Sequence, residues 1–360
     1  MTLVLFVAGL GLLILGAEWL VKGASRIAST LGLSPLVIGL TVVAYGTSAP
    51  EIAVGVKAAW AGQSDLALGN VVGSNVFNIL FILGLSAIIA PLPVASQLVR
   101  FDVPIAIGLS ALVWLLGADS TIGRLDGALL FAGAIAYTVF QVVQSRRESA
   151  EVQQEYARHS SARTSSMAVN LMFVAAGLAL LVLGSRWLVA GAVVIAQALG
   201  VSELVIGLTV VAAGTSLPEV ATSILAAIRG ERDIAVGNVM GSCIFNILAV
   251  LGLSGIVAPA GLPVSDALLG FDIPIMIAVA VACLPIFASG ARIARWEGAV
   301  FLFYYVAYTA YLVLRAQQHD ALSAYSAIMQ AFVLPLAVIT LAVMGWRVRA
   351  RSREESGLGS

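Results

Sequence analysis

The sequence predicts an all-α polytopic membrane protein with two inverted five-helix repeats and one extra C-terminal transmembrane helix, 11 TM helices in all. The prediction rests on composition, on eleven apolar runs and on motifs that occur in both halves of the chain. Of the 360 residues, 60% are hydrophobic and 11% are charged, whereas roughly 25% are charged in a soluble domain. The runs lack the alternation of apolar and polar residues that barrel strands require, which favours helices.

Each apolar run can form one membrane-spanning helix, because about 20 residues are enough to cross a bilayer. The first run has no basic segment before it and no small-residue cleavage site after it, so we expect a helix and not a secretion signal. The runs lie at residues 3–21, 34–61, 66–90, 102–118, 125–144, 167–189, 202–229, 233–258, 272–289, 297–315 and 325–346.

The basic residues predict the orientation of the chain. With the N-terminus outside, all but four of the 19 Lys and Arg residues fall in cytoplasmic segments, as the positive-inside rule requires. The four are Lys57, Arg124, Arg186 and Arg315. We therefore expect a multi-pass protein of the cell inner (plasma) membrane with a cytoplasmic C-terminus. The net charge of zero does not indicate a partner, and the lack of a basic stripe argues against nucleic acid. No protein partner is indicated besides the lipid bilayer.

The two halves of the chain share long motifs. LGLSPLVIGLTVVAYGTSAPE (31–51) matches LGVSELVIGLTVVAAGTSLPE (199–219). DLALGNVVGSNVFNILFILGLS (65–86) matches DIAVGNVMGSCIFNILAVLGLS (233–254). Repeats of this kind indicate that two related units build one structure.

The motifs divide the chain into four parts. Residues 1–144 form the first five-helix repeat, 145–166 a polar cytoplasmic linker, 167–315 the second repeat, and 316–360 the extra C-terminal helix with a basic tail. Because five is odd, the second repeat enters the membrane in the opposite orientation. Inverted repeats are typical of secondary transporters, whose site lies near the bilayer midplane where the repeats meet.

A polar interruption occurs in the second and seventh runs. Pro50 cannot donate a hydrogen bond to the carbonyl of Gly46, and Gly46 itself loosens the helix. The same pair recurs in the second repeat as Pro218 and Gly214. We expect each helix to break and to free carbonyl groups near residues 44–47, which the membrane tolerates only beside protein, water or an ion. The alternative is a proline kink satisfied by Ser and Thr side chains.

Two glutamates, Glu51 and Glu219, favour an ion over a simple kink. A carboxylate near the bilayer centre costs at least ~2.5–3.5 kcal/mol, and no Lys or Arg lies at comparable depth in the repeat helices. If the repeats bring both carboxylates together, a proton or a cation must lie between them. Oxygen ligands without His or thiolate suit Ca²⁺ and Na⁺. Further oxygens are available from Thr47, Ser48, Thr215 and Ser216.

The third and eighth helices add a polar face each. Their Asn and Ser side chains recur every four residues and so lie on one side of the helix. Ser74, Asn78, Ser242 and Asn246 are predicted ligands, and Asn70 and Asn238 are predicted supports. The alternative is that these side chains only join helices to one another, as small and polar residues do in membranes.

Other polar residues are predicted to be structural. Asp102 and Asp272 precede a proline and are expected to cap helix N-termini. Asp126 and Glu297 begin helices and interact there with the helix dipole. The two cysteines lie in apolar runs and are expected to pack as small hydrophobic residues: Cys243 and Cys283.

The motifs GTSAPE with GNVVGSNVFN, and GTSLPE with GNVMGSCIFN, resemble the paired α-repeats of the sodium/calcium exchanger branch of the cation/calcium antiporter family, prokaryotic type. The resemblance covers residues 1–315. It implies ten core helices, alternating access, and exchange of Ca²⁺ against Na⁺ at a shared midplane site, with no cofactor beyond the transported ions. The ligands it implies are Glu51, Glu219, Thr47, Ser48, Thr215, Ser216, Ser74, Ser242, Asn78, Asn246 and the carbonyls of Ala44 and Ala212.

Two positions qualify the resemblance. Asn246 stands where some relatives, including potassium-dependent ones, carry Asp, so the chain looks potassium-independent. Cys243 departs from the usual Asn, which Asn75 keeps, and we expect an effect on packing.

Two rival functions stay open at this point. A proton-coupled Ca²⁺/cation exchanger would use the same glutamates as titrating groups. A membrane-embedded hydrolase or a passive channel belongs to another class, and the lack of a nucleophile–base pair or of His and Cys spacing for zinc argues against an enzyme.

Overall fold

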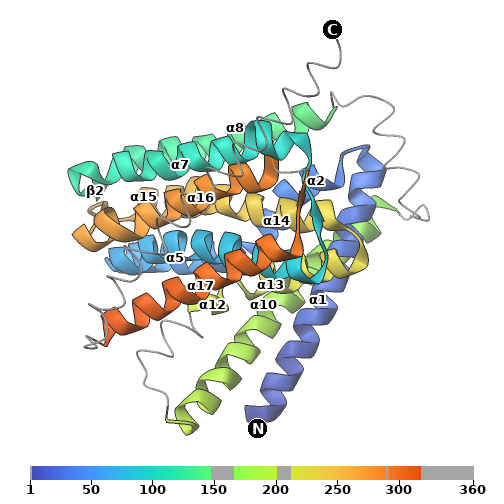
Figure 1. The fold of residues 1–360 in the computed structure, drawn as a ribbon, viewed down its shortest axis with the longest axis horizontal. Helices are drawn as coiled ribbons and strands as arrows, with labels where there is room; N and C mark the ends of the chain where they lie inside the picture. Colours follow the sequence, from blue (N-terminus) through green and yellow to red (C-terminus); the bar gives the residue numbers. More distant parts are fainter. Residues whose placement is uncertain (1, 147–165, 201–211, 289–290, 318–360) are drawn as a thin grey trace.

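The computed structural model describes residues 2–146, 166–200, 212–288 and 291–317 as a mostly helical bundle (Figure 1). Most of the predicted linker and the whole predicted run at 325–346 lie outside the described residues. The predicted run at 202–229 is described only from Ala212 onward. The prediction of eleven spans is therefore not tested along its full length.

The described helices follow the apolar runs. In the first half they are α1 (Thr2–Leu31), α2 (Pro35–Ile38), η1 (Gly39–Val43), α3 (Ala44–Thr47), α4 (Ala49–Trp60), α5 (Ser64–Phe77), η2 (Asn78–Leu83), α6 (Gly84–Ile89), η3 (Leu98–Asp102), α7 (Val103–Leu116), η4 (Gly117–Asp119) and α8 (Arg124–Arg146). In the second half they are α10 (Met167–Ala198), α12 (Ala212–Gly214), α13 (Leu217–Arg229), α14 (Arg232–Phe245), η6 (Asn246–Leu251), α15 (Gly252–Val257), η7 (Leu268–Asp272), α16 (Ile273–Ala288) and α17 (Arg295–Ala316). Among the described residues, eight helices, several of them composite, are long and apolar enough to cross a membrane, and the bent pair Pro35–Thr47 and Ala49–Trp60 can make a ninth.

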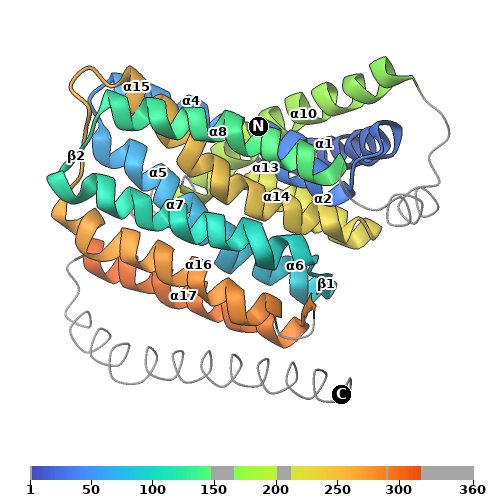
Figure 2. The same cartoon turned by 90° about the horizontal axis from the view of Figure 1, so that it is seen from above.

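Two long helices, α1 and α10, pack together along most of their length and project from the rest of the helical bundle (Figures 1 and 2). Glycines let their backbones approach closely. A Cβ at Gly9 would lie 2.8 Å from the carbonyl of Gly184, and one at Gly16 would lie 2.8 Å from that of Gly177. Since residue numbers rise on one helix as they fall on the other, the pair is antiparallel.

Polar contacts tie α1 to the turn between α13 and α14. Arg229 forms an ion pair with Glu18 at 2.7 Å, and Ser25 donates a hydrogen bond to Glu231 at 2.8 Å. The positions matched to Arg229 and Glu18 by the sequence repeat are Ala61 and Arg186, which cannot form such a pair.

The centre of the bundle is formed by α5 with η2 and by α14 with η6, which are the most deeply buried spans. Gly237 and Gly241 bring α14 against α2 and η1, because added Cβ atoms would lie 2.6 Å from the carbonyls of Leu36 and Leu40. Gly237 and Gly241 therefore form a close packing seam of the kind that two small residues four apart predict. The matched pair Gly69 and Gly73 forms no such seam, because an added Cβ would meet nothing within 4 Å at either position.

Two short antiparallel ladders join loops of the two halves. The strand β1 (Leu92–Pro93) pairs with β4 (Arg292–Ile293), and β2 (Thr121–Ile122) pairs with β3 (Leu262–Pro263). Each ladder thus links a connection in one half with a connection in the other.

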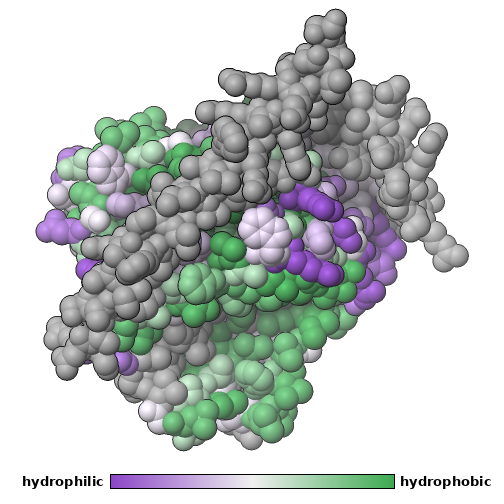
Figure 3. Space-filling model, viewed as in Figure 1, coloured by the Kyte–Doolittle hydropathy of each residue, from purple (hydrophilic) through white to green (hydrophobic). Residues whose placement is uncertain are grey.

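Large apolar side chains cover much of the outer surface (Figure 3). Leu3, Leu125 and Val306 are 67%, 82% and 65% exposed. Apolar surface of this extent suits contact with lipid rather than water.

The structure corrects the assignment of Asp102 and Asp272 as helix caps. The chain is already helical at Asp102, which has φ −70° and ψ −42° and makes no capping hydrogen bond. The π-helical segments η3 and η7 instead carry the chain without a break into α7 and α16. The Asp102 carboxylate, fully buried, accepts hydrogen bonds from Tyr137 at 2.9 Å and from Gln141.

The remaining structural assignments are confirmed. Asp126 accepts a hydrogen bond from the backbone of Gly123 at 2.8 Å, and Glu297 accepts one from Ala294 at 2.7 Å, so both satisfy helix N-termini. Cys243 and Cys283 are buried free thiols.

Candidate cation site

The site is built on the two helix breaks. Ser48 separates α3 from α4 with ψ 6°, and Ser216 separates α12 from α13 with ψ 8°. The first break bends the helix by 47°. Pro50 and Pro218 stand in the first turn of the second helical segment, where the missing amide hydrogen costs nothing.

The breaks place each glutamate in the first turn of a helix. Glu51 lies in the first turn of α4 and Glu219 in the first turn of α13. The first backbone N–H groups of a helix have no partner within it, and the helix dipole is positive there. A negative charge is therefore stabilised at both positions.

Gly46 and Gly214 leave space for side chains of a neighbouring helix. A Cβ at Gly46 would lie 2.6 Å from the side chain of Leu178, and one at Gly214 would lie 2.7 Å from that of Val189. Both neighbours belong to α10. The glycines thus let this helix pass close to each break.

The two carboxylates are brought together and are cross-linked by serines of the opposite half. Ser216 donates a hydrogen bond to Oε1 of Glu51 at 2.8 Å, and Ser48 donates one to Oε1 of Glu219 at 3.1 Å. Both glutamates are 1% exposed and close enough for their charges to interact. Neither forms an ion pair with a described Lys or Arg.

Asn70 on α5 and Asn238 on α14 hold the backbone beside the glutamates. Asn70 donates to the carbonyl of Glu51 at 3.1 Å, and Asn238 donates to that of Glu219 at 3.4 Å. Asn238 also accepts a hydrogen bond from Thr47 at 3.1 Å. The hydroxyl of Ser74 lies 3.3 Å from that of Ser216, which brings α5 into the same cluster.

Several buried polar atoms around the glutamates have no hydrogen-bond partner among the described residues. An unpartnered buried polar atom costs about 1–3 kcal/mol, so a cluster of them indicates a missing ligand. They are Oε2 of Glu51, Oε2 of Glu219, both amide atoms of Asn78, Oγ1 of Thr215, Oγ of Ser242 and Oδ1 of Asn246. Nearly all are oxygens, which are the ligands of hard cations such as Ca²⁺ and Na⁺.

The chemistry of this cluster is restricted to oxygen and amide groups. Within the residues that the structure describes, no group of three or more His, Cys, Asp or Glu side chains could hold a metal ion. Asn78 and Asn246 each begin a π-helical segment, η2 and η6, and such segments often occur at functional sites.

The carbonyl of Ala44 is not freed by the helix break, contrary to expectation. The carbonyl of Ala44 already accepts hydrogen bonds from the amide of Ser48 at 3.0 Å and from the hydroxyl of Thr47 at 3.3 Å. Ala212 is the first residue of α12, and its role as a ligand stays a prediction.

The sequence analysis missed Ser223, which accepts a hydrogen bond from Asn238 at 2.9 Å. Ser223 follows Glu219 by four residues, so helical spacing places it on the same face of α13. Its matched position in the first half is Gly55, which carries no hydroxyl. This four-residue spacing from Glu219 could have predicted that Ser223 lies near the site.

Residues 1–143 and 169–314 match the sequence profile described as Sodium/calcium exchanger protein. The chain is 41% identical over 305 residues to a putative antiporter CaxA of Alkalimonas amylolytica, covering 83% of this chain and 95% of that one. It is 32% identical over 338 residues to a sodium/calcium exchanger MaX1 of Methanosarcina acetivorans, covering 84% and 96%.

The fold also resembles a solved structure. The sodium-calcium exchanger NCX_Mj, in a crystal soaked without Na⁺ and Ca²⁺, superimposes with a TM-score of 0.74 at 32% sequence identity. The match covers 86% of this chain and 98% of that one.

Proposed function

This chain belongs to the sodium/calcium exchanger family, and we propose that it exchanges Ca²⁺ for Na⁺ by alternating access at the site between Glu51 and Glu219. Members of this family are secondary transporters and not enzymes. The observation that carries the proposal is the pair of buried carboxylates, each bonded by a serine of the opposite half and each left with one unpartnered oxygen.

The proposed ligands are the oxygens that surround this pair. The unpartnered atoms supply acceptors for a cation, and the hydrogen-bonded serines can turn their lone pairs toward it. The set is Glu51, Glu219, Thr47, Ser48, Thr215, Ser216, Ser74, Ser242, Asn78, Asn246 and the carbonyl of Ala212. The carbonyl of Ala44 is left out, because it already accepts two hydrogen bonds.

Coupling follows from the charge of the pair. Two carboxylates buried together without a counter-charge are costly, so an empty site resists closure on both sides. One Ca²⁺ or several Na⁺ neutralise the pair and permit the closed state. Since both ions use the same carboxylates, they compete, and an ion load is required for each passage across the membrane.

The proposed architecture is an inverted repeat in the cell inner membrane. The N-terminus lies outside and the C-terminus lies in the cytoplasm. The antiparallel pairing of α1 with α10 and the ladders between loops of the two halves support the inversion. The distribution of Lys and Arg supports the orientation.

The test is ⁴⁵Ca²⁺ uptake into liposomes that contain the purified protein, with Na⁺, K⁺ and H⁺ gradients imposed one at a time. We expect uptake with an outward Na⁺ gradient and none with K⁺ or H⁺ alone, with empty liposomes as the control. In the Na⁺ arm a protonophore and a potassium clamp keep pH and potential constant, and both are left out when a H⁺ or a K⁺ gradient is imposed. Uptake driven by a pH gradient and indifferent to Na⁺ would replace the proposal by proton-coupled Ca²⁺ exchange.

A further inference from the structure

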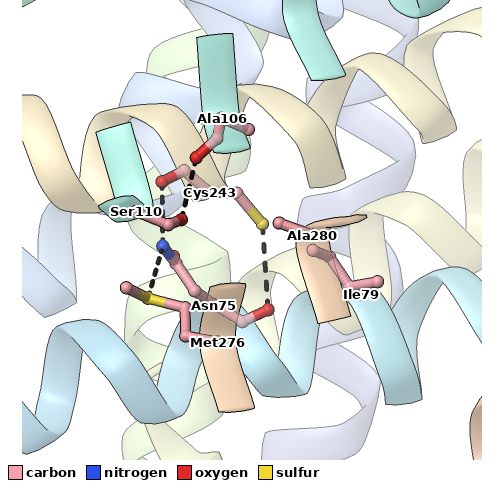
Figure 4. A pocket seen from close by; sticks show the side chains of 7 residues that line it. All are labelled: Asn75, Ile79, Ala106, Ser110, Cys243, Met276 and Ala280. Atoms are coloured by element: carbon pink, nitrogen blue, oxygen red, sulfur yellow. Dashed lines mark hydrogen bonds between the residues drawn. The ribbon is translucent and has the colours of Figure 1, made fainter. Parts of the chain in front are cut away.

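Asn75 and Cys243 occupy matched positions in the two halves, three residues before Asn78 and Asn246. All four side chains are buried at the contact between α5–η2 and α14–η6. Figure 4 shows Asn75 and Cys243 facing one another beside a small cavity, with Met276 of α16 at its edge. The two halves therefore carry different chemistry at this contact.

Hydrogen bonds fix the orientation of the Asn75 amide. Its Nδ2 lies 3.1 Å from the backbone carbonyl of Cys243, and a carbonyl can only accept. A second contact, 3.5 Å to the sulfur of Met276, holds the same nitrogen. The Oδ1 atom of Asn75 must therefore face the other way.

The fixed amide of Asn75 in turn fixes Asn246. Oδ1 of Asn75 accepts a hydrogen bond from Nδ2 of Asn246 at 3.0 Å. The Oδ1 atom of Asn246 is thereby directed away from Asn75 and has no partner among the described residues. The relay runs from the Cys243 carbonyl through Asn75 to Asn246 and leaves one amide oxygen available to a cation.

In the other half the same relay is interrupted. The thiol of Cys243 still points to the backbone carbonyl of Asn75, at 3.9 Å, which is the equivalent of the first link. A thiol is only a weak hydrogen-bond acceptor and cannot replace an amide oxygen. The thiol of Cys243 interacts with Asn78 only weakly, and neither amide atom of Asn78 has a hydrogen bond of regular geometry within the described part of the chain.

We propose that Asn75 is a positioning residue that presents the amide oxygen of Asn246 to the transported cation, and that Cys243 withholds the same support from Asn78. The inference rests on the proposed function, because it takes Asn78 and Asn246 as ligands. The two halves then supply one preorganised and one unoriented amide ligand. The Asn78 amide must be ordered when Ca²⁺ binds, and this entropic cost lowers the affinity for Ca²⁺.

Three single variants and one swap test the proposal. Asn75→Ala removes the relay, and we expect the Ca²⁺ concentration for half-maximal exchange to rise about 10-fold, as for other partners that orient a metal ligand, with a smaller change in maximal rate. Cys243→Asn should lower that concentration several-fold, since the cavity beside Cys243 leaves room for the larger side chain. Cys243→Ala is the matched control and should change little.

The swap Asn75→Cys with Cys243→Asn moves the relay to the other half. It should restore half-saturation by Ca²⁺ to within about 3-fold of the original chain. A swap as impaired as Asn75→Ala would overturn the proposal. Where a variant transports too poorly for half-saturation to be measured, calorimetry of Ca²⁺ binding to the purified protein without Na⁺ compares the Ca²⁺ affinities of the variants directly.

The outcomes separate the two proposals. Absence of Na⁺-driven Ca²⁺ exchange in the original chain would overturn the proposed function. Normal exchange in the original chain, with unchanged half-saturation in Asn75→Ala and in Cys243→Asn, would overturn the role of Asn75 alone.

Discussion

Glu51 and Glu219 occupy the same place in the two halves of the sequence, but their surroundings differ. Asn70 donates a single hydrogen bond, to the carbonyl of Glu51, whereas Asn238 donates to both Glu219 and Ser223 and accepts from Thr47. The first half has Gly55 where the second has Ser223. The two halves thus carry the same glutamate but differ in the side chains that hydrogen-bond to its helix. The site therefore combines similar ligands with backbones that are held by different numbers of hydrogen bonds.

The largest effect is expected from the feature in which the halves agree. Glu51→Gln and Glu219→Gln should each reduce Na⁺-driven ⁴⁵Ca²⁺ uptake by at least about 100-fold. Each variant removes one of the two negative charges that balance the bound cation, and losing one partner of a buried pair of opposite charges costs ~3–5 kcal/mol. Asp65→Asn, at an exposed carboxylate in the first turn of α5, is the matched control. Uptake that survives in one glutamine variant would show that the halves do not share the cation equally.

A smaller effect should separate the halves. Asn238→Ala removes three hydrogen bonds and Asn70→Ala removes one, and each is worth about 0.5–1.5 kcal/mol. At about 0.6 kcal/mol for each bond, we expect half-saturation by Ca²⁺ to rise about 20-fold in the first variant and about 3-fold in the second. The variant Ser223→Gly makes the second half resemble the first, and it should reduce the cost of Asn238→Ala. Equal effects of the two alanine variants would contradict the difference in rigidity.

The smallest effect concerns the ion pair between Arg229 and Glu18, which the other half lacks. Both side chains are about half exposed, at 55% and 43%, and such pairs contribute roughly 0.2–1 kcal/mol. Arg229→Gln and Glu18→Gln should each lower the melting temperature in detergent by a few degrees at most, and less in high salt. A double variant that loses no more than either single one would confirm that the two act as a pair. A large loss in Arg229→Gln alone would assign that residue another role.

The elements that depend on local pattern could be predicted from the sequence. Apolar runs gave the positions of the described spans, and Pro50 with Glu51 marked the helix break. Contacts between residues far apart in the chain could not be predicted in the same way. The carboxylate of Asp102 bonds Tyr137 and Gln141, and nothing in the local pattern of an Asp before a Pro distinguishes that contact from a helix cap.

The candidate site shows the same division. The repeat of GTSAPE and GTSLPE indicated that Glu51 and Glu219 meet, and the structure places them together. The exchange of serines between the glutamates depends on how the halves pack, so the sequence alone could not specify it. Ser223 was within reach of helical spacing from Glu219. The effect of Cys243 required the position of the Asn75 amide.

The serine contacts also bear on how the chain is made. Ser216, the partner of Glu51, is synthesised 165 residues after it. At a synthesis rate of about 5–20 residues per second, Glu51 waits roughly 10–30 s for that hydroxyl group. During this interval the Glu51 carboxylate lacks the hydrogen bond that Ser216 donates in the complete chain.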